Sequence, residues 1–147
     1  WLINIYFIST MISNFLLPKI LRKIGSIWTV YLSFASIAIG VILTGQATNF
    51  YLLLLSQMVI GFGYGVGYPL LLGFASDSSE KTQMSVSMGV FQSIYAIGMF
   101  IGPSFSTSLS VITGVPTMLV IIGLLIFSSG FFITLRNREL FSEKSEY

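Results

Sequence analysis

The chain has 147 residues, of which 54% are apolar and only 8% are charged, and its formal net charge is +2. Soluble domains carry about 25% charged residues, so this composition excludes an ordinary soluble domain, and the small net charge gives no indication of a nucleic-acid partner. The sequence contains no Cys and no His, so disulfides and the commonest metal ligands are excluded, and we expect no metal and no cofactor.

The charged residues fall into three clusters, within residues 19–23, 77–81 and 136–146. Residues 24–76 and 82–135 contain no charge at all, and each stretch is long enough for two membrane spans of about 20 residues with a turn between them. A charged side chain at the centre of a bilayer costs about 2.5–3.5 kcal/mol. The pattern therefore predicts apolar segments solvated by lipid, with the bilayer as a partner.

Five apolar segments follow one another along the chain. The predicted spans are residues 1–17, 27–45, 50–75, 84–112 and 117–135. They are joined by a basic turn at 18–25, uncharged turns at 46–49 and 113–116 and a polar loop at 76–83, and a polar tail at 136–147 closes the chain. Strands of membrane barrels alternate apolar and polar residues over about 10 positions, whereas these runs are continuous and longer. We predict an all-α membrane protein with five transmembrane helices.

The basic residues indicate how the chain is oriented. They lie at the first turn and in the tail, while the two turns on the opposite side hold no basic residue; the residues are Lys19, Arg22, Lys23, Arg136 and Arg138. Cytoplasmic loops carry the excess of Lys and Arg. We therefore expect a multi-pass protein of the plasma membrane whose charged loops and C-terminus are cytoplasmic, with Trp28 as an interfacial anchor.

Two glycine-rich segments flank the polar loop. Residues 61–69 read GFGYGVGYP and residues 89–103 read GVFQSIYAIGMFIGP. This order of a Gly-rich helix, a polar loop and a helix with a Gly-Pro pair resembles the major facilitator superfamily of secondary transporters. The spacing of Gly89, Gly98, Gly102 and Pro103 is similar to a motif of that family's fifth helix, which recurs more loosely in its eleventh. The resemblance implies a five-helix fragment of a twelve-helix bundle.

The first turn resembles the family's loop between helices two and three or between helices eight and nine. The residues that carry this resemblance are Lys19, Arg22, Lys23 and Gly25. Two frames therefore fit, helices two to six or helices eight to twelve. We favour the second, because Arg22 stands where the first-half motif has Asp and Gln57 stands where the fourth helix often has Arg. Because the sequence begins with Trp1, we expect it to be the downstream part of a longer protein, with the N-terminal half as its missing partner.

Small residues in the third and fourth spans have two interpretations each. Gly61, Gly63, Gly65 and Gly67 form two GxxxG pairs on roughly opposite faces of one helix, which predicts close packing against two neighbours. A bendable segment is the alternative.

In the fourth span, Gly98 and Gly102 continue into Ser106 and Ser110 as one small-residue stripe. Pro103 lacks the N–H that would reach Met99, so a kink is favoured. The resemblance implies that this kink shapes a cavity wall, and a tolerated proline without a mechanical role is the alternative.

Polar or soft side chains recur at helical spacing within three of the spans. The candidates for lining a substrate cavity are Asn4, Asn14, Gln57, Tyr64, Tyr68, Met88, Gln92 and Tyr95. Amides and phenols buried in a membrane must find partners, so they either form interhelical hydrogen bonds or line a polar cavity. The resemblance places helices eight, ten and eleven on the cavity and helices nine and twelve outside it.

The resemblance implies secondary transport of a small solute by alternating access. The spans offer only uncharged groups, which suit neutral or amphipathic solutes, and a carboxylate that carries a coupling proton would have to lie in the missing half. A membrane receptor or scaffold of the same fold is the main alternative. A channel would need a filter-like loop, and an enzyme would usually need ionisable groups that the spans lack.

Overall fold

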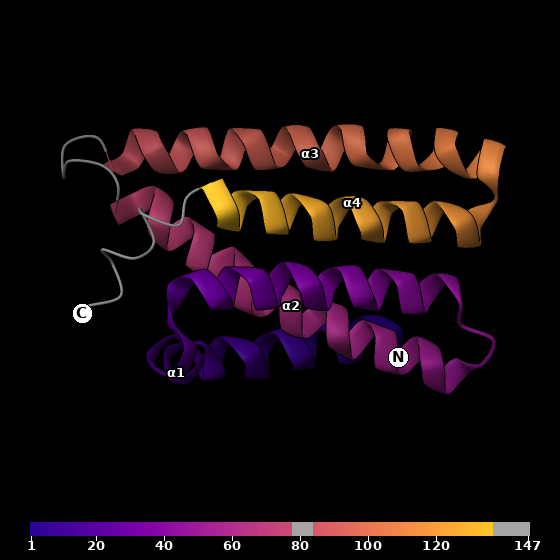
Figure 1. Ribbon diagram of the computed structural model, residues 1–147, viewed down its shortest axis with the longest axis horizontal. Helices are drawn as coiled ribbons and strands as arrows, with labels where there is room; N and C mark the ends of the chain where they lie inside the picture. Colours follow the sequence, from indigo (N-terminus) through magenta and orange to yellow (C-terminus); the bar gives the residue numbers. More distant parts are fainter. Residues whose placement is uncertain (78–83, 137–147) are drawn as a thin grey trace.

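The computed structural model describes residues 1–77 and 84–136, and the regular secondary structure in these ranges is entirely α-helical. The helices labelled in Figure 1 are α1 (Leu2–Gly45), α2 (Phe50–Asp77), α3 (Met84–Thr113) and α4 (Val115–Arg136). The predicted all-α fold is confirmed over these residues. Most of the predicted loop at 76–83 and nearly all of the predicted tail at 136–147 lie outside the described residues.

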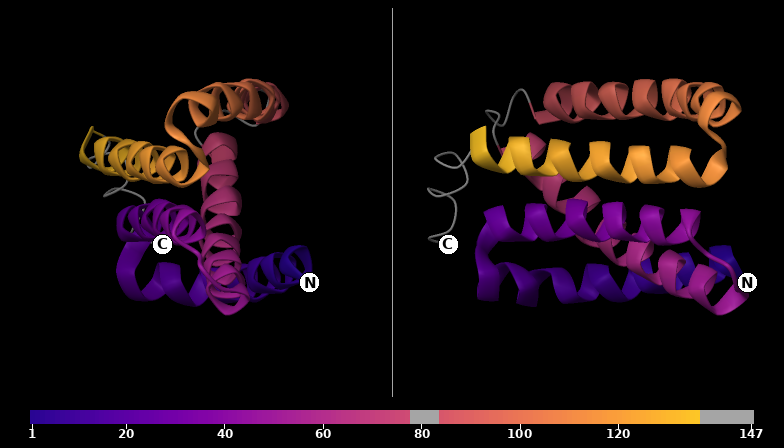
Figure 2. Two further views of the ribbon diagram at one scale, coloured as in Figure 1. Left: turned by 90° about the vertical axis from the view of Figure 1, so that its right-hand side faces the viewer. Right: turned by 45° about the vertical axis from the view of Figure 1, so that its right-hand side comes forward.

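Helix α1 contains two of the predicted spans. Its 44 residues would extend about 66 Å as one straight rod, more than twice the roughly 30 Å of a hydrocarbon core. Gly25 interrupts the helical backbone with φ 77° and ψ 170°, a region that glycine enters without steric cost. The chain reverses there, so that the first arm (residues 2–24) and the second arm (residues 26–45) run in opposite directions (Figures 1 and 2).

The turn between the two arms is shorter than the sequence predicts. Residues 18–24 remain helical, with Pro18 inside the helix, and the helical geometry is lost only at Gly25. The hydroxyl of Thr29 donates a hydrogen bond of 2.6 Å to the carbonyl oxygen of Gly25, which ties the start of the second arm to the break. Lys19, Arg22 and Lys23 therefore lie on the last turns of the first arm, where all three are exposed.

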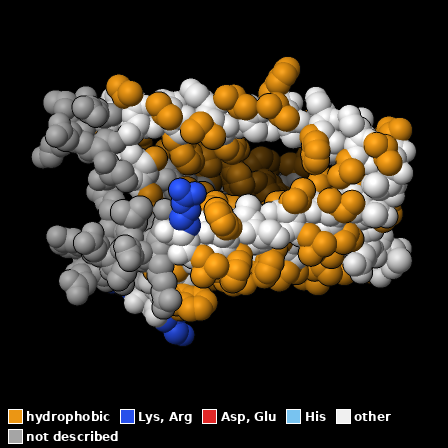
Figure 3. All heavy atoms as spheres, turned by 45° about the horizontal axis from the view of Figure 1, so that its top comes forward, with side chains coloured by type: hydrophobic (Ala, Val, Ile, Leu, Met, Phe, Trp, Pro, Cys, Tyr) orange, Lys and Arg blue, Asp and Glu red, His pale blue; other side chains and the backbone are white. Residues whose placement is uncertain are grey.

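All four helices are long and apolar enough to cross a membrane, judged by length and composition. Many large apolar side chains are exposed on their outer surfaces, among them Phe15 at 80% and Phe100 at 83%. Apolar side chains cover much of the face drawn in Figure 3 and surround a hollow beside α3, whereas the Lys and Arg side chains of the described residues appear toward one end of that face. Such a surface fits a lipid environment.

Helix α2 packs between the two arms of α1 through its glycines. A Cβ added at Gly61 would lie 2.5 Å from the carbonyl oxygen of Tyr6, and one added at Gly65 would lie 2.5 Å from that of Thr10. Both contacts are with the first arm. On the other side of α2, a Cβ at Gly63 would lie 2.7 Å from the carbonyl oxygen of Ser33 in the second arm. The GxxxG pairs thus allow two backbones to approach α2 from two sides.

Hydroxyl groups add polar contacts along these helix pairs. Ser9 donates to the carbonyl oxygen of Met58 at 2.6 Å, and Thr10 donates to that of Gly61 at 3.1 Å. Near the opposite end of the second arm, the hydroxyls of Thr44 and Ser56 lie 3.0 Å apart. Thr10, Thr44 and Ser56 also bond to backbone carbonyl oxygens of their own helices, so these interhelical bonds add to pairs that already satisfy the hydroxyls.

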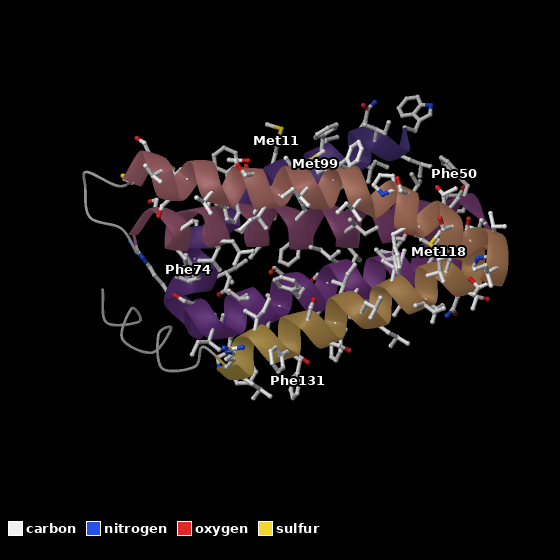
Figure 4. All side chains as sticks on the ribbon, turned by 90° about the horizontal axis from the view of Figure 1, so that it is seen from above. Met11, Phe50, Phe74, Met99, Met118 and Phe131 are labelled. Atoms are coloured by element: carbon white, nitrogen blue, oxygen red, sulfur yellow. The ribbon has the colours of Figure 1, made fainter. Side chains whose placement is uncertain are left out.

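Helix α4 packs on the second arm of α1. A Cβ at Gly123 would lie 2.5 Å from a side-chain carbon of Ile42, and one at Gly130 would meet the side chain of Phe34. The rings of Tyr31 and Phe127 meet edge to face with centroids 5.8 Å apart. On the outer side of α4, Phe131 points away from the other helices (Figure 4).

Helix α3 has far fewer neighbours than the other helices. None of its residues is buried, and a Cβ added at Gly89, Gly98 or Gly102 would meet no atom within 4 Å. It approaches α2 near its start, and it joins α4 through a turn at Gly114 with φ 79°. The helix continues without interruption through Pro103.

Candidate functional site

Four of the predicted cavity residues meet where α2 approaches α3. The hydroxyls of Tyr64 and Tyr95 lie 2.7 Å apart in a hydrogen bond, and the amide nitrogen of Gln92 donates to the hydroxyl of Tyr68 at 2.8 Å. The Tyr64 and Tyr68 rings stack with centroids 5.6 Å apart, and the Tyr95 ring meets Tyr68 edge to face at 5.5 Å. Two side chains from each helix therefore form one connected group.

Helix geometry explains why these residues converge. Tyr64 and Tyr68 are four residues apart, and Gln92 and Tyr95 are three apart, so each pair shares one helix face. Tyr68 precedes the end of α2 by nine residues and Gln92 follows the start of α3 by eight, which places both about 12–14 Å from the connected helix ends. Tyr64 and Tyr95 lie deeper, at about 16–20 Å, close to half the thickness of a hydrocarbon core.

Two aromatic residues that the sequence interpretation missed extend this group. The ring of Tyr6, on the first arm of α1, lies 6.1 Å from that of Tyr64, and the ring of Phe91 lies 6.1 Å from that of Tyr68. We call the set formed by Tyr6, Tyr64, Tyr68, Phe91, Gln92 and Tyr95 the tyrosine cluster. It joins α1, α2 and α3.

A signal for Tyr6 was present in the sequence. Tyr6, Thr10 and Ser13 recur at spacings of four and three, so they form one stripe on the first arm. This stripe packs against Gly61 and Gly65 of α2. A stripe of hydroxyl-bearing residues facing a GxxxG pair could therefore have placed Tyr6 beside Tyr64.

The other four predicted cavity residues lie apart from the tyrosine cluster. Asn4 and Asn14 are exposed on the first arm, and Gln57 and Met88 are half-buried. Over residues 1–77 and 84–136, no hydrogen bond or ring contact connects any of them to the cluster. Gln57 precedes Tyr64 by two helical turns, or about 10 Å along α2.

The tyrosine cluster is rich in aromatic faces and carries no formal charge. A flat apolar solute can stack on its rings, its phenols can donate or accept hydrogen bonds, and a cation can lie over a ring face. Among the described residues, no group of three or more His, Cys, Asp or Glu side chains is placed to hold a metal ion. The arrangement therefore suits reversible binding of an amphipathic molecule.

Comparison with known proteins gives two matches. The model of the Major Facilitator Superfamily matches residues 1–146. A multidrug efflux pump, SdrM of Staphylococcus aureus (strain N315), is 30% identical over 98 residues, which make up 67% of this chain and 22% of the pump. The aligned part of the chain thus spans about a fifth of that relative. No solved structure matches the chain.

Proposed function

This chain belongs to the major facilitator superfamily, and we propose that it forms helices eight to twelve of a secondary transporter that works by alternating access. Its family and its apolar helices make it an integral, multi-pass membrane protein whose general function is membrane transport. Secondary transporters hold their solute near the bilayer midplane between two pseudo-symmetric halves. In this proposal the chain supplies part of the second half.

The frame of helices eight to twelve is supported by one residue in the basic turn and one in the third span. Arg22 and Gln57 both depart from the residues expected in the first half of the family. In this frame the first arm of α1, α2 and α3 are helices eight, ten and eleven, and these are the helices that the tyrosine cluster joins. The second arm of α1 and α4 are then helices nine and twelve, which contribute no member to the cluster.

The observation that carries the proposal is the Tyr64–Tyr95 hydrogen bond within an uncharged aromatic group near mid-membrane depth. Such a wall favours aromatic, neutral or lipophilic solutes over small ions or sugars, because rings stack on rings and few charges or amides are available. A relative that is a multidrug efflux pump is consistent with this solute class. We therefore propose amphipathic aromatic compounds as solutes, with the tyrosine cluster as part of their path.

The rest of the protein would cover the exposed side of α1 and α3. Met11 on the first arm and Met99 on α3 are 62% exposed each, and they project on the side opposite Phe131 (Figure 4). We propose that the missing half and the solute path lie on the side of Met11 and Met99. The Phe131 side would then face lipid, with the Lys19–Lys23 end of the bundle at the cytoplasmic surface of the plasma membrane.

Transport by the full-length protein in proteoliposomes tests the proposal, with efflux of ethidium, a planar aromatic cation, as the probe. Tyr95→Phe keeps the ring and removes the hydroxyl that bonds Tyr64. In this proposal the Tyr64–Tyr95 bond holds the ring faces in the arrangement that binds the solute. Losing a neutral hydrogen bond of about 0.5–1.5 kcal/mol should therefore raise KM about two- to tenfold. Tyr51→Phe is the matched control, because Tyr51 lies at the far end of α2 and is 81% exposed.

Three results would count against the proposal. Equal KM values for Tyr95→Phe and Tyr51→Phe would remove the tyrosine cluster from the solute path. Saturable ethidium binding without movement across the membrane would favour a receptor or scaffold. If ethidium were neither bound nor moved, amphipathic aromatic compounds would be rejected as the solute class.

A further inference from the structure

An open groove on the second arm of α1 lies apart from the tyrosine cluster. It has a volume of about 610 Å³ and is lined by Lys23, Ile24, Trp28, Tyr31, Leu32 and Ala35. The groove shares no residue with the cluster, so solute transport does not account for it.

The groove follows the axis of the second arm. Trp28, Tyr31, Leu32 and Ala35 recur at spacings of three, one and three, which places them on one helical stripe. Ala35 lies ten residues after Gly25, or about 15 Å along the helix. This is half of a hydrocarbon core of about 30 Å, so the groove extends through the depth of one membrane leaflet.

The two ends of the groove differ in chemistry. Lys23 provides an ammonium group at the end beside the chain reversal, and Leu32 and Ala35 provide an apolar wall at the deep end. Between them the Trp28 side chain is 65% exposed, and its indole N–H is a donor suited to the polar boundary of a bilayer.

Ring contacts fix the wall of the groove in place. The rings of Trp28 and Tyr31 meet at 90° with centroids 6.3 Å apart, and Tyr31 in turn meets Phe127 of α4. The wall is therefore supported by a second helix. A supported wall is preorganised, which lowers the cost of ordering side chains when a ligand binds.

Electrostatics select an anionic occupant. Lys19 and Arg22 lie within four residues of Lys23, and residues 1–76 contain no Asp or Glu. The positive charge at this end of the groove thus has no acidic residue within the two arms to neutralise it. A ligand with an anionic head and an apolar chain would complement both ends of the groove.

We propose that this groove binds one anionic phospholipid, with its phosphate at Lys23 and one acyl chain along Trp28, Leu32 and Ala35. The lipid comes from the leaflet at the Gly25 end of the bundle. That leaflet is cytoplasmic in the orientation on which the proposed function rests, and the cytoplasmic leaflet is the one that carries anionic lipids. Lys19 and Arg22 lie outside the groove and contribute only diffuse attraction.

Native mass spectrometry of the full-length protein, titrated with phosphatidylglycerol or phosphatidylcholine in detergent, tests the site. Lys23→Gln should weaken phosphatidylglycerol binding about fivefold, the value of one basic residue near an anionic surface. Arg22→Gln removes one positive charge from the preceding residue, which lies about 100° around the helix from Lys23 and outside the groove, and we expect it to weaken binding less than twofold. Phosphatidylcholine binding should respond little to either change.

A second variant tests the apolar end without changing the charge. Ala35→Leu extends into the space assigned to the acyl chain, so it should weaken phosphatidylglycerol binding several-fold, because each buried CH₂ of a lipid chain contributes to binding. An unchanged elution volume in size-exclusion chromatography shows that the variant is folded. A variant that does not fold is replaced by Leu32→Ala, which removes apolar contact and should also weaken binding.

The outcomes separate this site from the proposed function. Equal losses for Lys23→Gln and Arg22→Gln would show diffuse electrostatics and overturn the site, as would unchanged binding in Lys23→Gln. Lipid binding in detergent requires neither transport nor a fixed orientation. Intact ethidium efflux without selective lipid binding therefore rejects the lipid site alone, whereas selective lipid binding without efflux rejects the transport proposal alone.

Discussion

The glycines of the two GxxxG pairs in α2 and the glycines of α3 lie in opposite environments, although both helices have the same small-residue spacing. At Gly61, Gly63 and Gly65 of α2 an added Cβ would lie within 3.0 Å of a neighbouring atom, whereas at Gly98 and Gly102 of α3 it would meet nothing within 4 Å. In α2 the small residues allow backbones to approach. In α3 they leave an open surface. Spacing alone therefore indicates that a helix can pack closely, and only the structure shows which neighbours do so.

The difference between the glycines of α2 and α3 is tested most strongly by filling the close contact at Gly65. In Gly65→Ala the added methyl group would meet the hydroxyl of Ser13 and lie 2.5 Å from the carbonyl oxygen of Thr10, and backbone atoms cannot move aside cheaply. Overpacking of this kind costs about 1–3 kcal/mol. We expect that loss in the free energy of unfolding, measured by denaturant titration of the full-length protein in detergent.

Two alanine substitutions serve as controls for Gly65→Ala. Gly73 lies in the same helix and Gly98 lies in α3, and a Cβ at either position would meet no described atom within 4 Å. Changes at such positions usually stay within about 0.5 kcal/mol. If all three variants lost the same stability, the difference between α2 and α3 would not hold.

A smaller effect is expected from the polar contact between the second arm of α1 and α2. The Thr44 and Ser56 hydroxyls lie 3.0 Å apart, and interhelical hydrogen bonds in membranes average about 0.6 kcal/mol. A double-mutant cycle with Thr44→Ala and Ser56→Ala should give a coupling energy of about that size. Pairing Thr44→Ala with Ser128→Ala should give none, because the hydroxyl of Ser128 in α4 bonds to Leu124 and no hydrogen bond joins it to Thr44. A zero coupling for Thr44 and Ser56 would contradict the contact.

The smallest effect is expected at the end of α2. If transport is proton-driven, Asp77→Asn should leave the ratio of protons to solute unchanged, because the coupling carboxylate is proposed to lie in the missing half. The same result is expected for Glu80→Gln. Glu80 lies outside the described residues. Proton and solute fluxes measured together in proteoliposomes give the ratio, and a changed ratio in either variant would place coupling in this chain.

The helical fold was predictable because charges are confined to helix ends and loops. An uncharged stretch that is long enough for two membrane spans has few alternatives to a helical hairpin. The second arm of α1 with α2, and α3 with α4, follow from this rule. The position of the reversal was less predictable, because Pro18 and Lys19 are typical of a turn, yet the helix continues to Ile24. The break at Gly25 depends on a positive φ, which sequence spacing does not encode.

The candidate site was predictable in part. Helical spacing placed Tyr64 with Tyr68 and Gln92 with Tyr95, and the antiparallel connection brought the two pairs together. Asn4 and Asn14 were chosen by the same rule and are exposed. Their place in a cavity wall stays a prediction, because periodicity identifies a shared face and does not say what that face meets. Tyr6 was missed because its ring partner, Tyr64, lies two spans further along the chain, on α2.

Cysteine accessibility tests most directly whether the α3 side of the bundle lines a water-filled path while the glycine contacts of α2 stay dry. The chain has no Cys, so Gln92→Cys and Val66→Cys can be compared in a full-length protein whose other cysteines are replaced. Gln92 is exposed and Val66 is fully buried. The account predicts that a membrane-impermeant thiol reagent modifies Gln92→Cys, that ethidium slows this reaction, and that Val66→Cys stays unmodified. Equal protection of both positions, with or without ethidium, would contradict it.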